Sequence, residues 1–106
     1  MDDESARKAA KNEVISRSLN EGLARGEDRW PSVVPTFICE CSDLSCTQEI
    51  ALDLEGYRTV REDPTHFFVV RGHEHLEIER VIAQGDGYFV VEKIGPGKDV
   101  AREAAS

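Results

Sequence analysis

The three cysteines of the chain fall within eight positions, as Cys39, Cys41 and Cys46 in the segment F-I-C-E-C-S-D-L-S-C. Thiols this closely spaced in a chain of ordinary composition indicate either a metal site or redox chemistry. Residues two apart on an extended strand face the same side, so Cys39 and Cys41 should present their sulfurs together while Glu40 points away. The turn-forming residues 42–45 can then bring the sulfur of Cys46 back to the same ion.

A fourth ligand must come from another part of the chain, because structural zinc is almost always bound by four groups in a tetrahedron. The candidates are the three histidines His66, His73 and His75. His73 follows Gly72 directly at the end of an expected strand, where a sharp turn can aim its ring, and we therefore favour it. His75 is the second choice, whereas His66 begins that strand and is expected to be solvated.

The preferred interpretation is a structural zinc ion held by three thiolates and one neutral imidazole. Its apparent binding free energy, about 10–16 kcal/mol, would rival the stability of the whole domain. The sequence leaves open a redox-sensing set of thiols with Cys46 as third partner, and cysteines that only pack in the core. It also leaves open a catalytic zinc with a bound water, which Glu40 or Glu74 would serve as base. Iron could replace zinc at a site this rich in thiolates.

The composition of the 106-residue chain, with 40% hydrophobic and 32% charged residues, is typical of one globular domain. The net charge is −8, and residues 31–106 carry seven Lys/Arg against fourteen Asp/Glu. This negative field disfavours nucleic-acid binding, because it repels a phosphate backbone. No apolar run approaches the roughly 20 residues that cross a bilayer, and the acidic start lacks the apolar stretch of an export signal. We therefore expect no membrane association and a cytoplasmic location.

The first element that must position the site is a helix predicted over residues 5–28. Its apolar residues recur every three or four positions, and the resulting stripe should pack on the domain or pair with a helix of a partner or second copy. The stripe consists of Ala10, Val14, Ile15, Leu19 and Leu23, with Glu13 and Arg17 largely off it. Trp30 opens a proline-bounded connector that completes the N-terminal segment 1–35. It is expected to anchor over the edge of the core, or else to face a partner.

Residues 36–94 are predicted to form the metal-binding unit. Strands are expected at 36–41, 49–52 and 67–71, and a helix capped by Asp53 should run to about residue 62, before Pro64. Residues 76–82 and 88–94 are the clearest pair, a hairpin with glycines in its turn. Residues 95–106 are expected to be a flexible tail. The predicted fold is thus α+β: an N-terminal helix, a small mainly antiparallel sheet, one short helix, a C-terminal hairpin and a loop held by zinc.

The run F-I-C-E-C followed by D-L-S-C-T resembles an uncharacterised family of small bacterial proteins. The resemblance covers about residues 36–93 and includes D-P-T at 63–65, G-H-E at 72–74 and the strand G-Y-F-V-V-E-K at 87–93. It implies that Cys39, Cys41, Cys46 and His73 belong to one site. It carries no activity over to this chain.

These observations together predict a small zinc-binding protein that acts as an interaction or regulatory module rather than as an enzyme. The expected partner is another protein, which would present a basic face to the acidic surface. A thiol-based redox regulator or metal-responsive regulator is the second interpretation, and a zinc hydrolase the third. DNA binding comes last, because the chain has neither a basic stripe nor a recognition-helix pattern.

Overall fold

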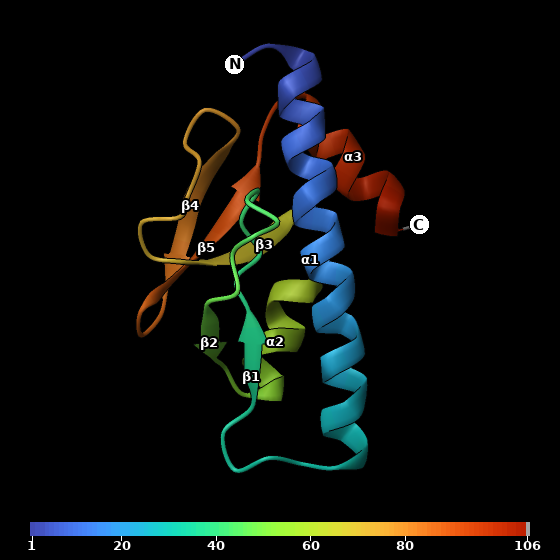
Figure 1. Cartoon of the computed structure of the whole chain (residues 1–106), viewed down its shortest axis with the longest axis vertical. Helices are drawn as coiled ribbons and strands as arrows, with labels where there is room; N and C mark the ends of the chain where they lie inside the picture. The colour runs from blue at the N-terminus through green and yellow to red at the C-terminus, as the bar shows by residue number, and fades with distance from the viewer. Residues whose placement is uncertain (106) are drawn as a thin grey trace.

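A computed structural model describes residues 1–105 and confirms the predicted α+β fold, with helices packed around two small antiparallel sheets (Figure 1). The elements in chain order are α1 (Asp3–Arg29), β1 (Thr36–Ile38), β2 (Glu49–Ala51), α2 (Leu54–Arg61), β3 (His66–Val70), β4 (Glu79–Gln84), β5 (Tyr88–Lys93) and α3 (Pro96–Ala105). No helix within residues 1–105 combines the length and the apolar character that crossing a membrane requires.

The core lies where the two sheets and α2 meet. β1 pairs with β2, and the larger sheet has the strand order β3-β5-β4. The Phe37 ring of β1 stacks on the Tyr57 ring of α2 with centroids 4.6 Å apart, and Phe68 of β3 meets both rings edge-on. As predicted, Asp53 caps α2, because its carboxylate accepts a hydrogen bond from the backbone N–H of Gly56 (2.7 Å).

The predicted hairpin is confirmed by the antiparallel pairing of β4 with β5. Its turn contains Gly87 at φ +80°, a conformation that favours glycine. β4 begins three residues later than expected, because residues 76–78 form a turn in which the N–H of Ile78 donates to the carbonyl of His75 (3.0 Å). A register shift between Val81 and Ala83 then bends the strand.

The face that α1 buries matches the predicted stripe only in part, because Ala10 is fully buried and Val14 packs against the core, but the rest of the stripe does not. Ile15, Leu19 and Leu23, expected to pack on the domain, are 45–57% exposed, and Trp30, expected over the core edge, is 81% exposed. The inward positions of α1 are instead taken mainly by small and polar residues: Ala6, Ala9, Ala10, Glu13, Ser16, Arg17 and Asn20. The C-terminal part of the predicted stripe, Ile15, Leu19 and Leu23, therefore lies on the outer face of this helix.

The polar inner face of α1 is stable because its side chains bind groups of other elements. The amide of Asn20 donates to the carbonyl of Ile38 (2.8 Å) and accepts from the N–H of the same residue (2.9 Å), so that it completes the edge of β1. Lys93 of β5, fully buried, donates to the carboxylates of Glu13 and Glu79. Burial, and then the charge of Glu79, raise the pKa of Glu13 well above its usual range, which favours a proton on Glu13 and a neutral triad.

The segment predicted as a flexible tail forms α3, which packs on α1 (Figure 1). Ala101 of α3 is fully buried, and its carbonyl accepts a hydrogen bond from Arg17 (3.1 Å). Gly97 permits the close approach of the two helices, because a Cβ at this position would lie 3.1 Å from the Cβ of Ala10. Ser106, the last residue of the predicted tail, lies outside the described residues.

Candidate metal centre

The side chains of Cys39, Cys41, Cys46 and His73 converge on one point, between the loop that follows β1 and the turn that follows β3. Their four ligand atoms lie within 4.8 Å of one another. The sulfurs of Cys39 and Cys46 are each 3.6 Å from Nδ1 of His73. With Zn–S near 2.3 Å and Zn–N near 2.0–2.1 Å, a sulfur and a nitrogen of one tetrahedron are separated by ~3.6 Å. The cluster therefore has the dimensions of a tetrahedral site and can hold a metal ion.

Cys46 is brought to the cluster by the tight turn predicted for residues 42–45. The carboxylate of Asp43 accepts from the N–H and the hydroxyl of Ser45 (2.9 and 2.6 Å), and these bonds lower the pKa of Asp43. The N–H of Cys46 donates to the carbonyl of Asp43 (3.0 Å). The amide of Asn12 in α1 donates to the carbonyl of Ser42 (2.9 Å). The loop is thus fixed both by its own hydrogen bonds and by α1.

His73 is aimed by a turn at the end of β3, as its position after Gly72 predicted. The N–H of His73 donates to the carbonyl of Val70 (2.9 Å), and Gly72 has φ +99°, which favours glycine. Glu74 accepts from the N–H of Gly72 (2.7 Å). The N–H of Val70 points at the sulfur of Cys39 (3.2 Å), so the same strand end stabilises a thiolate and positions the histidine.

A residue that the sequence did not indicate lies beside the outer nitrogen of His73. The side-chain amide of Gln48 is 3.3 Å from Nε2 of His73. When Nδ1 binds a metal, Nε2 carries the ring proton and needs an acceptor. Rotating the Gln48 amide by half a turn exchanges its nitrogen and its oxygen, so that the oxygen accepts the hydrogen bond from that ring proton. Gln48 is therefore positioned to fix the tautomer and the orientation of the ring.

The other two histidines lie outside the cluster. His75, the second choice for the fourth ligand, lies 4.0 Å from the carboxylate of Glu77. His66 is not solvated as predicted: its Nε2 lies 3.1 Å from Glu92 and 3.4 Å from Asp63. The ligand atoms of Asp63, His66 and Glu92 lie within 4.8 Å of one another. The ion pairs that His66 can form with the two carboxylates, one of which links β3 to β5, account for this proximity.

The three thiols of the cluster differ in acidity. The pKa of Cys41 is lowered, first because the thiol of Cys39 donates a hydrogen bond to it. The pKa of Cys39 is raised by that same bond and then by burial, and burial also raises the pKa of Cys46. Deprotonation therefore begins at Cys41. Coordination by three thiolates must displace the remaining protons, so metal affinity should fall as the pH is lowered.

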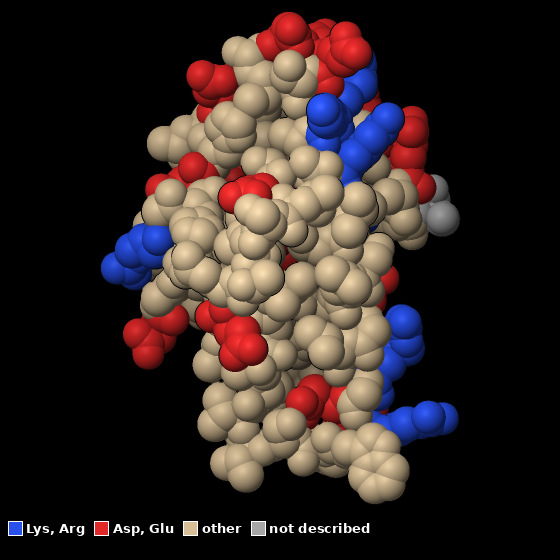
Figure 2. All heavy atoms as spheres, viewed as in Figure 1, with Lys and Arg blue, Asp and Glu red and all other residues tan. Residues whose placement is uncertain are grey.

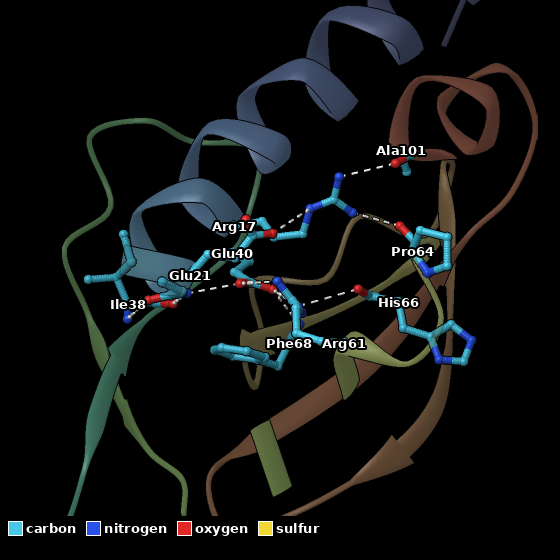
Figure 3. Close-up of polar contacts among 10 residues, drawn as sticks. Arg17, Glu21, Ile38, Glu40, Arg61, Pro64, His66, Phe68 and Ala101 are labelled. Atoms are coloured by element: carbon cyan, nitrogen blue, oxygen red, sulfur yellow. Dashed lines mark hydrogen bonds and ion pairs between the residues drawn. The ribbon is translucent and has the colours of Figure 1, made fainter. Parts of the chain in front are cut away.

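Glu40, in the loop after β1, is fully buried, and its carboxylate faces Arg61 (Figure 3). Its two oxygens accept from the guanidinium of Arg61 (2.9 and 2.6 Å), and further hydrogen bonds come from Asn20 (2.9 Å) and from the N–H of Phe68 (3.2 Å). A carboxylate bound in this way is not available as a base for a metal-bound water. The hydrolase interpretation thus loses one of its two candidate bases, Glu40.

Comparison of the chain with protein-family models, with curated proteins and with solved structures gives no match. The resemblance of the F-I-C-E-C region to a family of small bacterial proteins therefore stays a prediction. No relative supplies an activity or a partner, so the chemistry of the cysteine–histidine cluster is the main evidence on function.

Proposed function

We propose that this protein is a small zinc-binding module in which the metal stabilises the fold and an exposed surface binds another protein. The observation that supports zinc most strongly is that three sulfurs and one imidazole nitrogen lie within 4.8 Å of one another, two of the sulfurs at 3.6 Å from the nitrogen, the separation of a sulfur and a nitrogen that bind one zinc ion. Three cysteines and one histidine are a common ligand set of structural zinc, and they leave no open position for water. Zinc in this site would be structural rather than catalytic.

The position of the cluster supports a structural role. Cys39 and Cys41 are buried members of the main hydrophobic core, whereas Cys46 and His73 are half-buried at its edge. The ligands come from two segments separated by α2 and β3, one joined to the small sheet and one to the large sheet. One ion would therefore connect both sheets through a few short bonds.

The metal is tested by purifying the full chain without added metal, followed by elemental analysis and X-ray absorption. We expect one zinc per chain with three sulfur neighbours and one nitrogen neighbour. His73→Ala should remove the nitrogen contribution of the ring and weaken zinc binding at least tenfold, because one of four ligands is lost. His75→Ala, which removes a ring two residues away, should leave the spectrum unchanged. Iron, substoichiometric metal, or equal effects of both variants would contradict the assignment.

The interaction surface that we propose is the outer face of α1, the exposed part of the predicted stripe. Ile15, Leu19 and Leu23 lie on consecutive turns of the helix, and Trp30 follows at its end. Figure 2 shows a broad uncharged area on the face that contains α1, with charged side chains mainly at its margins. Exposed apolar side chains that share one face of a helix are typical of protein-binding sites. The net charge of −8 favours a partner with a basic face.

Leu19→Glu tests this surface. Because Leu19 is 57% exposed, the change should alter the free energy of unfolding by no more than about 0.5 kcal/mol. It should nevertheless abolish co-purification of the partner, and binding to the unchanged protein should weaken as salt is added. Leu76→Glu, at an exposed leucine in the turn before β4, is the matched control and should retain the partner. Loss of binding in both variants, or in neither, would argue against the α1 surface.

A thiol-based regulator is the second candidate, favoured by the closeness of the three cysteine sulfurs in one cluster. Such sulfurs can form a disulfide when an oxidant displaces the metal. Mild peroxide should then release zinc together with formation of a disulfide, and a thiol reductant should reverse both changes. Thiols that stay inert in the zinc-loaded protein would remove this function and leave the structural one.

A further inference from the structure

A second site is suggested by a cavity that contains none of the metal-cluster residues. The cavity has a volume of about 450 Å³ and lies between α1, α2 and the end of α3. This size is within the range of sites that bind small molecules. Part of its wall is apolar, formed by Ala24, Pro64, Ala104 and Ala105.

The charged residues that line this cavity are mostly positive, although the chain as a whole is negative. Arg17, Arg25 and Arg61 contribute three guanidinium groups, against the carboxylates of Glu21 and Asp63. Arg17 is only 3% exposed, and burial and the nearby charge of Arg61 lower its pKa. The charge of Arg61 is balanced by Glu40, and Glu21 lies 3.8 Å from Arg17, so the cation that remains available to an added anion is Arg25.

Most donors of the two inner arginines are already used (Figure 3). The Arg17 guanidinium donates to the carbonyls of Pro64 (2.7 Å) and Ala101 (3.1 Å), and it lies 3.8 Å from the carboxylate of Glu21. Both terminal nitrogens of Arg61 donate to Glu40. These bonds fix the two guanidinium groups, so that Arg17 contributes positive charge to the cavity while Arg61 keeps its Nε–H.

Two buried polar atoms of residues that line the cavity have no hydrogen-bond partner within residues 1–105. These are Nε of Arg61 and the hydroxyl oxygen of Tyr57, a residue that is 4% exposed. The Tyr57 hydroxyl lies beside the Arg61 guanidinium, whose charge and hydrogen bonding partly offset the rise in the pKa of Tyr57 that burial causes. Buried polar groups are nearly always hydrogen-bonded, and Nε–H can only donate. The group that would satisfy both is an acceptor. Arg25 lies at the exposed side of the cavity. Its guanidinium forms no ion pair or hydrogen bond within residues 1–105, so all of its N–H donors are free.

We propose that this cavity binds the oxyanion, a carboxylate or a phosphate, of a small molecule. Arg61 Nε–H and the Tyr57 hydroxyl donate to the anion, and Arg25 closes on it from the exposed side. The alanine and proline wall contacts the apolar part of the ligand. Glu21 and Asp63 at the rim limit the charge that the site accepts, which favours an anion of low charge.

The experiment uses the full zinc-loaded chain and two probes, sodium phosphate and sodium acetate. Each is titrated in separate samples, with sodium chloride adjusted to constant ionic strength, while backbone amide shifts are recorded. We expect saturable shifts around the cavity, at residues such as Ala24 and Ala104, with one of the two anions binding more tightly. That preference identifies the anionic group of the ligand. Shifts that fail to saturate with either salt would overturn the proposal.

Three variants distinguish a specific anion-binding site from non-specific electrostatic attraction of the anion to arginine side chains. Tyr57→Phe should weaken binding of the preferred anion about tenfold, because it removes one of the two donors to the anion. A thermal scan without anion checks that the fold is retained, since the hydroxyl also lies beside Arg61. Arg25→Gln should weaken binding to a similar extent. Arg29→Gln removes the same charge one turn further along α1, outside the cavity, and should have no effect. Equal weakening by the Arg25 and Arg29 changes, or full affinity in Tyr57→Phe, would show an adventitious ion only.

Discussion

Removing the metal with a strong chelator should abolish the cooperative thermal transition and most of the amide protection of residues 36–94. The physical reason is that the binding free energy of structural zinc, about 10–16 kcal/mol, is as large as the stability of a typical domain. Cys39 and Cys41 are also buried in the main core, so loss of the ion would break bonds that connect this core to the segment of His73. Circular dichroism during a thermal scan, followed by hydrogen exchange, measures both effects.

Cys41→Ser should reproduce this result without chelator, because a serine hydroxyl is a poor zinc ligand. Lowering the pH should produce the same loss gradually, since protons compete with zinc for the three sulfurs and affinity falls as the pH is lowered. Restoring zinc after chelation should restore the transition in the unchanged protein but not in Cys41→Ser. Native amide protection that persists after complete metal removal would contradict a structural role.

Arg61→Ala should lower the free energy of unfolding by about 3–5 kcal/mol, the second largest effect that we expect from a single change. The substitution leaves Glu40 fully buried without the guanidinium that binds both of its oxygens. It also removes a cation that lies over the rings of Tyr57 and Phe68, 5.3 Å from each centroid. Denaturant titration of the zinc-loaded protein measures the change.

Arg58→Ala is the matched control on the same helix. Arg58 pairs with Asp28 at 2.6 Å, but both side chains are largely exposed, and such a pair contributes no more than about 1 kcal/mol. Replacing both members of the buried pair, as in Glu40→Leu with Arg61→Met, should recover much of the stability lost in Arg61→Ala, because no buried charge remains unpaired. A small effect of Arg61→Ala would mean that water reaches Glu40.

The metal cluster could be predicted from sequence because its determinants are local. Cys39 and Cys41 lie two residues apart, turn-forming residues precede Cys46, and a glycine precedes His73. Each of these features depends on neighbours a few positions away. The expected strand 36–41 ends at Ile38, so both cysteines lie in the loop that follows β1. Gln48 was missed because its role depends only on where the ring of His73 lies in space, and no spacing rule applies to it.

The inner face of α1 was predicted only in part: Ala10 and Val14 face the core as expected, but Ile15, Leu19 and Leu23 are exposed. Glu13 and Arg17 are buried because Lys93, 80 residues beyond Glu13, and Ala101, 84 residues beyond Arg17, offer complementary groups. Such distant pairing leaves no periodic signal. The helical end of the chain was missed for the same reason, since α3 is held by its contact with α1.

The pairing of α1 with β5 and α3 joins residues that lie 80 or more positions apart in the chain, which has a consequence for biosynthesis. The ribosome completes α1 long before Lys93 and Ala101 are made, so Glu13 and Arg17 stay hydrated while the residues between them are synthesised. The native packing of α1 therefore cannot form until residues 93–101 have left the exit tunnel.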